Sequence, residues 1–242
     1  MNFEKYFEHP AIRFLTTNYR SNKTIVGAGN ALILNNPEGS QIKKILQANT
    51  VDQKNNSENK ITVFLSRHEK NYFTNYKKQI AEKCVNQIKE CHNEGISFDD
   101  MMVLYRITDS KIIILLEEAA KKNGIPLNFA PKGHESKFLP ENKNGVLVAT
   151  VHKCKGLEAK AVFILNVDKG LYGFPCELEN PVIYETAKPI NEVKDKLEEE
   201  RRLFYVAITR AKEKLFIFAQ KGYESKFLDE IKNFTEKKEL YY

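Results

Sequence analysis

Three short segments of the chain combine residue types that can bind nucleotides or nucleic acid. The first is Leu15–Ser21 (LTTNYRS), which is followed by a helix-like run to Asn35. In it Tyr19 stands beside Arg20, and an aromatic ring can stack on a flat base while an arginine grips a phosphate. Taken alone the pair is weak evidence, because a packing role for Tyr19 and a surface role for Arg20 are the commoner arrangement.

The second segment, Ala149–Glu158 (ATVHKCKGLE), lies between two apolar runs. It places a hydroxyl at Thr150, an imidazole at His152 and a lysine at the end of an expected strand. Gly156 lets the backbone approach a ligand closely, and the carboxylate of Glu158 can accept hydrogen bonds from a ribose. Without further context, a lone histidine and a Lys-Gly turn are more often structural than functional.

The third segment is Glu198–Lys212 (EEERRLFYVAITRAK), with three acids, two arginines, an apolar stripe and then Thr209-Arg210. A structural interpretation is a solvated, salt-bridged helix whose apolar stripe packs on a sheet. It leaves unexplained why Arg210 follows Thr209 at the end of the stripe. The stripe itself consists of Leu203, Phe204, Val206 and Ala207.

Composition bounds the classes of protein to which the chain can belong. Its 242 residues carry 38 Lys+Arg against 32 Asp+Glu, a net charge of +6, and 42% are hydrophobic, which is enough for a packed core. No apolar run approaches the ~20 residues of a membrane helix, and the first ten residues lack the apolar stretch of a signal peptide. The four cysteines show neither a CxxC pair nor zinc-ligand spacing. We therefore expect a reduced, cytoplasmic protein without a membrane or metal site, and its mild basic charge permits an anionic partner.

Short apolar runs alternate with helical patterns, which predicts an α/β fold around a mainly parallel sheet. Several of the runs are apolar at consecutive positions, as in strands that are buried on both faces. In such sheets ligands bind at the carboxyl ends of the strands. The expected strands are Ile61–Leu65, Met101–Tyr105, Val146–Val151, Ala161–Val167 and Leu215–Ala219, and the expected helices are Asn71–Glu94, Asp109–Asn123 and Glu192–Ala211.

Polar and irregular stretches lie between these expected strands and helices. The polar run Gln47–Lys60 predicts an exposed loop or linker between a first helical segment and the main body. Pro131–Gly145 and Asp168–Pro189 are rich in turn-forming residues. The charged tail Glu224–Tyr242 is expected to be helical.

In their order along the chain and in their residues, the three segments resemble motifs of the UvrD/Rep family of superfamily 1 DNA helicases, specifically of its C-terminal, RecA-like motor domain. NYRS at Asn18–Ser21 resembles motif IV, TVHKCKGLE at Thr150–Glu158 resembles motif V, and Glu198–Lys212 resembles motif VI. VLYR at Val103–Arg106, followed by a helix and GIP, looks like the segment that these helicases carry between motifs IV and V. The resemblance runs from about Phe14 to Ala219, so we treat residues 1–242 as one such domain.

The resemblance implies a role for five residues in binding ATP. The motif IV tyrosine, here Tyr19, stacks on the adenine, and the adjacent Arg20 reaches the γ-phosphate. The motif V glutamate, here Glu158, bonds the ribose, with Gly156 lining the same pocket. The motif VI arginine, here Arg210, is an arginine finger that acts with Arg20 as a catalytic residue. Two planar guanidinium groups would neutralise the charge that spreads over the transferred phosphoryl group.

The resemblance also implies a DNA-binding face. The motif V threonine and histidine, here Thr150 and His152, face single-stranded DNA in this family. The implied mechanism is alternate closing and opening of two RecA-like domains around ATP, which steps the protein along the strand. The implied partners are therefore single-stranded DNA and the N-terminal motor domain of the same protein.

Several departures from the family pattern limit what these 242 residues can do alone. They contain no GxxxxGK[ST] loop and no apolar strand that ends in an Asp-Glu pair. In this family both belong to the N-terminal motor domain, so we expect Mg²⁺ only through that domain and no ATP hydrolysis by this chain alone. The large helical insertion before motif V is absent or vestigial, since only about Pro131–Gly145 occupies its place. At three further family positions the sequence has Thr108 for asparagine, Ala159 for phenylalanine and Cys176 for histidine.

Two functions from different classes remain. The first is the C-terminal half of an ATP-driven DNA helicase or translocase. The alternative is a non-catalytic nucleic-acid-binding module with a helicase-derived fold, and a plain nucleotide-binding α/β domain remains if the motif match is accidental. Retention of Arg20, Glu158 and Arg210 favours the first, because a pure binding module has no use for them. A phosphate-binding loop encoded upstream of Met1 would separate the two.

Overall fold

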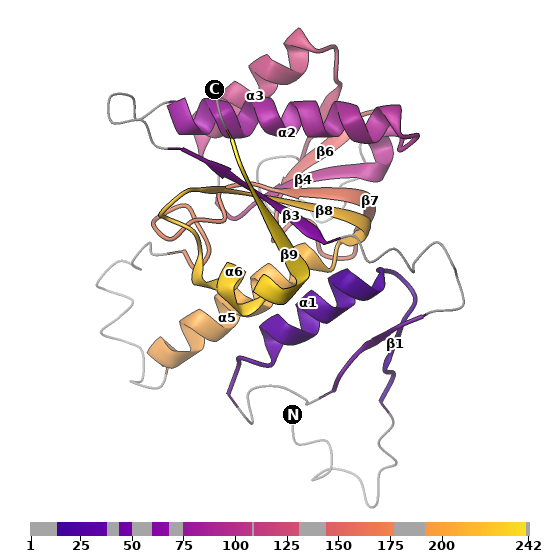
Figure 1. The fold of residues 1–242 in the computed structure, drawn as a ribbon, viewed down its shortest axis with the longest axis vertical. Coiled ribbons are helices and arrows are strands. Elements are labelled where there is room, and N and C mark those ends of the chain that lie inside the picture. Colours follow the sequence, from indigo (N-terminus) through magenta and orange to yellow (C-terminus); the bar gives the residue numbers. More distant parts are fainter. Residues whose placement is uncertain are drawn as a thin grey trace, which may run out of the picture.

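The computed structural model of the chain describes residues 14–37, 44–49, 60–67, 75–107, 109–130, 144–176 and 192–240. A seven-stranded sheet forms the middle layer, and every neighbouring pair of its strands is parallel (Figure 1). The strand order across the sheet is β5-β6-β4-β7-β8-β3-β9. In chain order the strands are β3 (Ile61–Ser66), β4 (Met101–Tyr105), β5 (Leu127–Phe129), β6 (Val146–Thr150), β7 (Ala159–Ile164), β8 (Ala211–Gln220) and β9 (Thr235–Glu239).

The central strands are buried on both faces, as their consecutive apolar residues predicted. Successive side chains of a strand point to opposite faces of a sheet. In β4, Met102 and Leu104 accordingly join one core cluster, whereas Met101, Val103 and Tyr105 join the other. The sheet therefore has two separate hydrophobic cores, and each requires a helical layer to cover it.

Helices supply both layers (Figure 1). On one face lie α2 (Asn75–Asn93) and α3 (Ser110–Lys122), and on the other lie α1 (Lys23–Ile33), α5 (Glu192–Ile208) and the short α6 (Lys226–Glu230). The limits of α3 follow from its sequence. The side chain of Asp109 accepts a hydrogen bond from Lys111 N at 3.1 Å, and the chain leaves the helix through Gly124, which has a φ of +67°.

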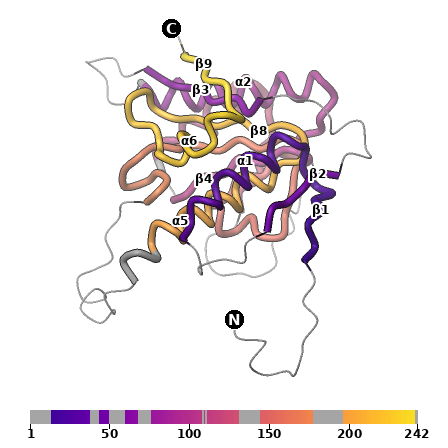
Figure 2. Tube along the Cα trace, turned by 60° about the horizontal axis from the view of Figure 1, so that its bottom comes forward, coloured from indigo at the N-terminus to yellow at the C-terminus, as the bar shows by residue number. Residues whose placement is uncertain are grey.

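A small two-stranded ribbon stands beside α1 (Figure 2). It pairs β1 (Thr17–Asn18) with β2 (Gln47–Ala48) in parallel. The side chain of Asn30 in α1 holds it, since Asn30 Nδ2 donates to Leu46 O at 2.8 Å and Leu46 N donates to Asn30 Oδ1 at 3.1 Å. The polar run Gln47–Lys60 is thus not wholly a loop, because it begins with β2, and residues 50–59 lie outside the described part.

Two predicted elements differ from the structure. The expected helix Glu192–Ala211 ends at Ile208, because the chain turns at Thr209-Arg210 and Ala211 already begins β8. The tail was predicted to be helical, and this is wrong for most of its length. After α6 and the 3₁₀ turn Lys232–Phe234 it forms β9, which pairs with β3 as an edge strand. The sequence TEKKE carries no apolar signal, since an edge strand buries little and charged side chains suit it.

The remaining expectations concern cysteines, metal sites and membrane helices. The four cysteines are free and buried. Within the described residues no group of three or more metal-binding side chains comes together, and no helix is long and apolar enough to cross a membrane. Between β5 and β6 the residues 131–143 lie outside the description, and this interval is too short for a large helical subdomain.

Candidate nucleotide-binding and DNA-binding sites

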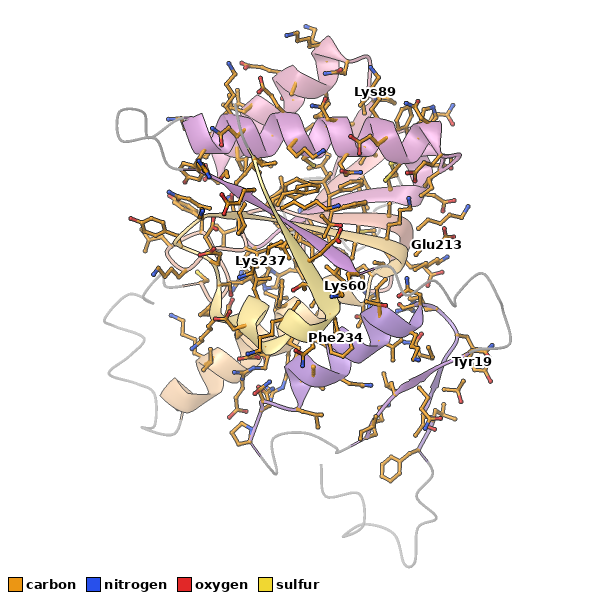
Figure 3. The ribbon with its side chains drawn as sticks, viewed as in Figure 1. Tyr19, Lys60, Lys89, Glu213, Phe234 and Lys237 are labelled. Carbon is orange, nitrogen blue, oxygen red and sulfur yellow. The ribbon has the colours of Figure 1, made fainter. Side chains whose placement is uncertain are left out.

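The motif IV segment forms a tight turn that presents Tyr19 and Arg20 to solvent. The side chain of Asn18 accepts hydrogen bonds from Arg20 N at 2.8 Å and from Ser21 N at 3.0 Å, which fixes the turn. Tyr19 is 74% exposed and projects away from the core (Figure 3). The alternative of a packing role for Tyr19 is therefore wrong.

Two buried residues after this turn join motif IV to motif VI. Ser21 and Asn22 are 1% and 2% exposed. Three successive carbonyl groups at the start of β8 accept their hydrogen bonds: Ser21 Oγ donates to Ala211 O at 2.6 Å, Asn22 N to Lys212 O at 3.0 Å and Asn22 Nδ2 to Glu213 O at 2.8 Å. The side chain of Asn22 also caps α1 by accepting from Ile25 N at 3.0 Å. Sequence reasoning gave neither residue this role, although an asparagine before an apolar helical run is a signal for a helix cap.

Glu158 lies between two cations in the same cavity as Tyr19. Arg20 Nε contacts Glu158 Oε2 at 2.7 Å, and Lys212 Nζ contacts Oε1 at 2.6 Å. The hydrogen bond from Lys212 and that from Arg20 hold the pKa of Glu158 below its usual value. The cavity has a volume of about 590 Å³, and its lining residues are Thr17, Asn18, Tyr19, Arg20, Leu46, Glu158 and Lys212.

Arg210 lies beside this cavity but does not line it. Its Nη1 donates to Leu157 O at 2.9 Å and its Nε to Val206 O at 3.0 Å, so the guanidinium caps the end of α5. Partial burial lowers the pKa of Arg210, and the nearby positive charge of Arg20 acts in the same direction. The Arg210 side chain is therefore half-buried and not directed freely into solvent. The nearby acids of motif VI have other partners, since Glu199 pairs with Arg202 and Glu200 pairs with Arg106.

Gly156 shapes the backbone and does not form part of the cavity wall. Its φ is +85°, which a side chain would make unfavourable, and a Cβ there would meet nothing within 4 Å. The expectation that Gly156 lines the nucleotide pocket is not met in this structure. The turn at Gly156 instead brings Leu157 O to Arg210 and Glu158 to Arg20.

The two sets of predicted site residues lie at opposite edges of the sheet. Thr150 ends β6 and pairs with Tyr105, the last residue of β4, so Thr150 lies at the carboxyl edge with the exposed His152 just beyond it. Glu158, by contrast, precedes the first residue of β7, and Ala159 N donates to Arg210 O at 3.0 Å. The candidate nucleotide residues therefore sit at the amino ends of β7 and β8, contrary to the expectation of a site at the carboxyl ends.

Motif V connects these two edges within a few residues. It leaves the carboxyl edge after Thr150, passes through the turn at 151–156 and reaches the amino edge at Glu158. At its start, protein atoms partly cover the imidazole of His152, which disfavours its charged form and lowers the pKa of His152. The positive charge of Arg106 lowers this pKa further. We therefore expect His152 to be mostly neutral at neutral pH, as a hydrogen-bonding group and not a cation.

The acidic and basic start of motif VI is largely buried, which corrects the interpretation of a solvated helix. Glu200 accepts hydrogen bonds from both sides of the Arg106 guanidinium, from Nε to Oε2 at 2.9 Å and from Nη2 to Oε1 at 2.5 Å, and a further one from Cys176 N at 3.1 Å. Arg201 Nε contacts Glu230 Oε2 at 2.8 Å. The apolar stripe behaves as predicted, because its members pack in the core beneath α5. Charges that were attributed to the surface thus fix α5 to the carboxyl end of β4, through Arg106, and to α6, through Glu230.

Two adjacent acids should respond very differently to substitution. Glu200→Ala is expected to lower the free energy of unfolding by about 3–5 kcal/mol, because it leaves the guanidinium of Arg106 buried without its partner. Glu199, whose side chain is 73% exposed, pairs with Arg202 at 3.2 Å. Glu199→Ala should therefore change stability by about 0.5 kcal/mol or less. Urea unfolding of both variants is the measurement, and equal destabilisation would contradict this assignment.

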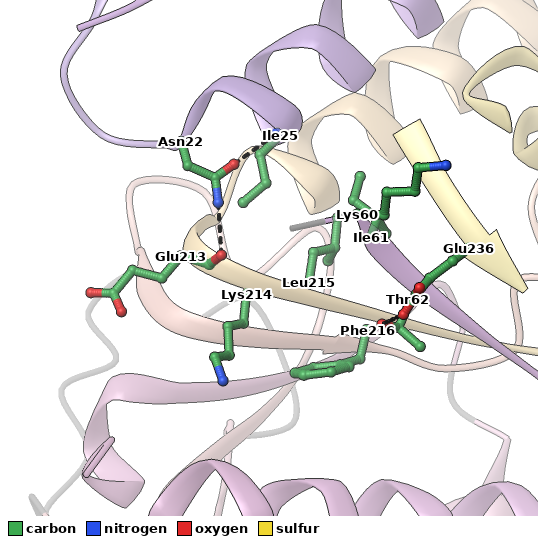
Figure 4. Close-up of a pocket in the computed structure, with 10 residues that line it drawn as sticks. All are labelled: Asn22, Ile25, Lys60, Ile61, Thr62, Glu213, Lys214, Leu215, Phe216 and Glu236. Atoms are coloured by element: carbon green, nitrogen blue, oxygen red, sulfur yellow. Dashed lines mark hydrogen bonds between the residues drawn. The ribbon is translucent and has the colours of Figure 1, made fainter. Parts of the chain in front are cut away.

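A second cavity, of about 360 Å³, opens at the same amino edge on the other side of Asn22 (Figure 4). Its polar groups are largely paired within the protein, as Figure 4 shows for Asn22 with Glu213 O and for Thr62 with Glu236. Its lining residues are Asn22, Ile25, Lys60, Ile61, Thr62, Glu213, Lys214, Leu215, Phe216 and Glu236. None of the predicted site residues belongs to it.

The fold is that of a UvrD-like helicase C-terminal domain. A profile of the UvrD-like helicase C-terminal domain matches residues 13–134 and 131–222, and the chain belongs to that family. The match confirms the predicted relationship to UvrD/Rep-type superfamily 1 helicases. The C-terminal domain of a possible DNA helicase from Lactobacillus plantarum WCFS1 has the same fold, with 18% identity and a TM-score of 0.51 over 91% of this chain and 98% of that one. The predicted RecA-like α/β fold is thereby confirmed.

Sequence relatives are named as DNA helicases. A probable DNA helicase of Mycoplasma pneumoniae is 30% identical over 205 residues, which are 84% of this chain and 31% of that protein. A probable DNA helicase II homolog of Mycoplasma capricolum is 37% identical over 51% of this chain and 14% of its own length. The ATP-dependent DNA helicase PcrA of Staphylococcus epidermidis is 35% identical over 38% of this chain and 12% of its own length. The chain thus spans a third or less of these relatives.

Proposed function

We propose that this chain is the C-terminal motor domain of an ATP-dependent DNA helicase or translocase, which completes an ATP site and contacts single-stranded DNA. The observation that carries the proposal is the cluster at the amino edge of β7 and β8. There motif IV gives Tyr19 and Arg20, motif V gives Glu158, and motif VI places Arg210 beside them. These residues come from segments far apart in the chain, and one open cavity collects the first three.

Each residue of the cluster then has a chemical role toward ATP. The exposed ring of Tyr19 offers a face on which adenine stacks, and the carboxylate of Glu158 accepts hydrogen bonds from the ribose. Arg20 and Glu158 hold each other in the structure at 2.7 Å, so nucleotide binding has to exchange this pair. Arg20 then turns to the γ-phosphate, and Glu158 turns to the ribose.

Arg210 supplies positive charge where the reaction develops negative charge. Its guanidinium rests on the carbonyl groups of Leu157 and Val206, which keep it at the edge of the cavity. When the N-terminal motor domain closes on this edge, Arg210 reaches the phosphoryl group and stabilises its charge in the transition state. The N-terminal motor domain contributes the phosphate-binding loop and the carboxylates for Mg²⁺.

The opposite edge of the sheet is the proposed DNA face. Thr150 and His152 lie at the carboxyl end of β6, and motif V continues from them directly to Glu158. A short continuous segment thus joins the DNA contact to the nucleotide contact. Through this segment, closure of the two domains around ATP moves the residues that contact the DNA. Stepping along single-stranded DNA requires such a coupling.

We expect weak, salt-sensitive binding of single-stranded DNA by the 242-residue chain. Two or three phosphate contacts from lysines of this face, such as the exposed Lys153 and Lys155, imply that affinity falls about tenfold between 50 and 200 mM salt. The measurement is fluorescence anisotropy with a labelled oligonucleotide, in which Thr150→Val and His152→Ala weaken binding. Lys89→Ala, on the exposed side of α2 (Figure 3), is the control and should bind normally. Affinity that is independent of salt, or equal in all variants, would contradict this DNA face.

A further inference from the structure

A β-bulge sits where β8 passes the candidate nucleotide cavity. Ala159 of β7 pairs with Ala211 and Ala161 pairs with Lys214, so two residues of β8, Lys212 and Glu213, stand opposite the single residue 160. A bulge of this kind bends the strand and re-aims a side chain. In β8 the bulge takes Lys212 out of the regular alternation of side chains between the two faces of the sheet, whereas Lys214 stands in regular register opposite Ala161.

The ion pairs show the result of this change in direction. Lys212 Nζ contacts Glu158 Oε1 at 2.6 Å inside the nucleotide cavity, whereas Lys214 pairs with Glu94, just beyond the end of α2. The main chain at Lys212 is held in place, because its carbonyl accepts the hydrogen bond from Asn22 N at 3.0 Å. Lys212, the last residue of the motif VI segment, thus adds a cation to the cavity, although sequence reasoning gave it no role there.

The carboxylate of Glu158 has two oxygens, and in the structure each has its own cation. Nucleotide binding as proposed above takes Arg20 away from Oε2 toward the phosphates. Without another cation, Glu158 would then stand as a bare carboxylate near a polyphosphate, which like-charge repulsion disfavours. Lys212 on Oε1 neutralises the carboxylate, keeps it ionised and leaves Oε2 open as a hydrogen-bond acceptor.

We propose that Lys212 is a positioning residue, which orients Glu158 toward the ribose hydroxyl groups and so helps the site to prefer ribonucleotides over deoxyribonucleotides. The inference rests on the proposed function, because it assumes that the cavity takes a nucleoside triphosphate. It goes beyond that function by assigning sugar selection to a pair of residues and by giving the β-bulge a purpose.

The test is titration of the 242-residue chain with ATP and with 2′-deoxyATP, followed by amide chemical shifts at the cavity. In the unsubstituted chain ATP should bind more tightly than 2′-deoxyATP. Lys212→Gln should weaken ATP binding about tenfold and remove most of the preference, while Lys212→Arg should restore much of it. Lys214→Gln is the matched control, two residues along the same strand, and should behave as the unsubstituted chain.

A double substitution separates positioning from direct contact. In a Glu158→Gln background, adding Lys212→Gln should cause no further loss, because Lys212 acts through Glu158. Further loss there, equal weakening of both nucleotides, or an unchanged Lys212→Gln variant would each overturn the inference while leaving the nucleotide site intact. Absence of any shift around the cavity with ATP in the unsubstituted chain would instead contradict the proposed site itself, and the inference with it.

Discussion

Replacing Arg210 with alanine is expected to lower the ATP turnover of the assembled helicase, in which this chain is joined to its N-terminal motor domain, by about 10³-fold or more. In the proposed mechanism this substitution removes the guanidinium that neutralises charge on the transferred phosphoryl group. Arg210 is placed for this role by the end of α5, where Leu157 O and Val206 O hold it at 2.9 and 3.0 Å beside the candidate nucleotide cavity.

The same contacts predict a modest loss of stability in this variant. Two hydrogen bonds to backbone carbonyls are removed, which costs about 1–3 kcal/mol in the free energy of unfolding. Turnover must therefore be measured below the unfolding transition of the variant. Arg210→Lys keeps the positive charge but not the planar fork, and it should also hydrolyse ATP poorly. Near-normal turnover in a folded Arg210→Ala variant would reject the catalytic role and leave Arg210 as a helix cap.

The part of the fold that could be predicted from the sequence is the part in which burial is extreme. Runs such as Met101–Tyr105 are apolar at every position, and only a strand covered on both faces requires this. The edge strand β9 could not be predicted in the same way, because its pairing with β3 depends on the position of the rest of the sheet. Likewise, the bulge in β8, where Lys212 and Glu213 stand opposite the single residue 160 of β7, has no signal in the sequence.

The candidate site shows the same division. Tyr19, Arg20 and Glu158 could be named from their motifs, and the structure gathers them in one cavity. The edge of the sheet at which they lie was predicted wrongly, because parallel sheets usually bind ligands at their carboxyl ends, whereas motif V passes from that edge to the amino edge within a few residues. The ion pair between Arg106 and Glu200, and that between Lys212 and Glu158, join segments distant in the chain, so only the tertiary fold reveals them.

The 242-residue chain alone is expected to show no ATPase activity at any concentration of single-stranded DNA. These residues contain no loop that could cradle the β- and γ-phosphates. The candidate cavity offers Tyr19, Arg20, Glu158 and Lys212, which can hold a base, a sugar and a phosphate but cannot activate the attacking water. DNA-stimulated hydrolysis by the pure chain would show that the proposed division of labour between two motor domains is wrong.

The central claim, that this chain is one half of a two-domain ATP site, is tested most directly by reconstitution. The chain is combined with the N-terminal motor domain of the same helicase, either as one polypeptide or as two, and ATP hydrolysis is followed with and without single-stranded DNA. We predict activity that requires both halves, rises with DNA and is abolished by Arg210→Ala. Hydrolysis by the N-terminal half that is unchanged by addition of this chain, or by its Arg210→Ala form, would contradict the claim.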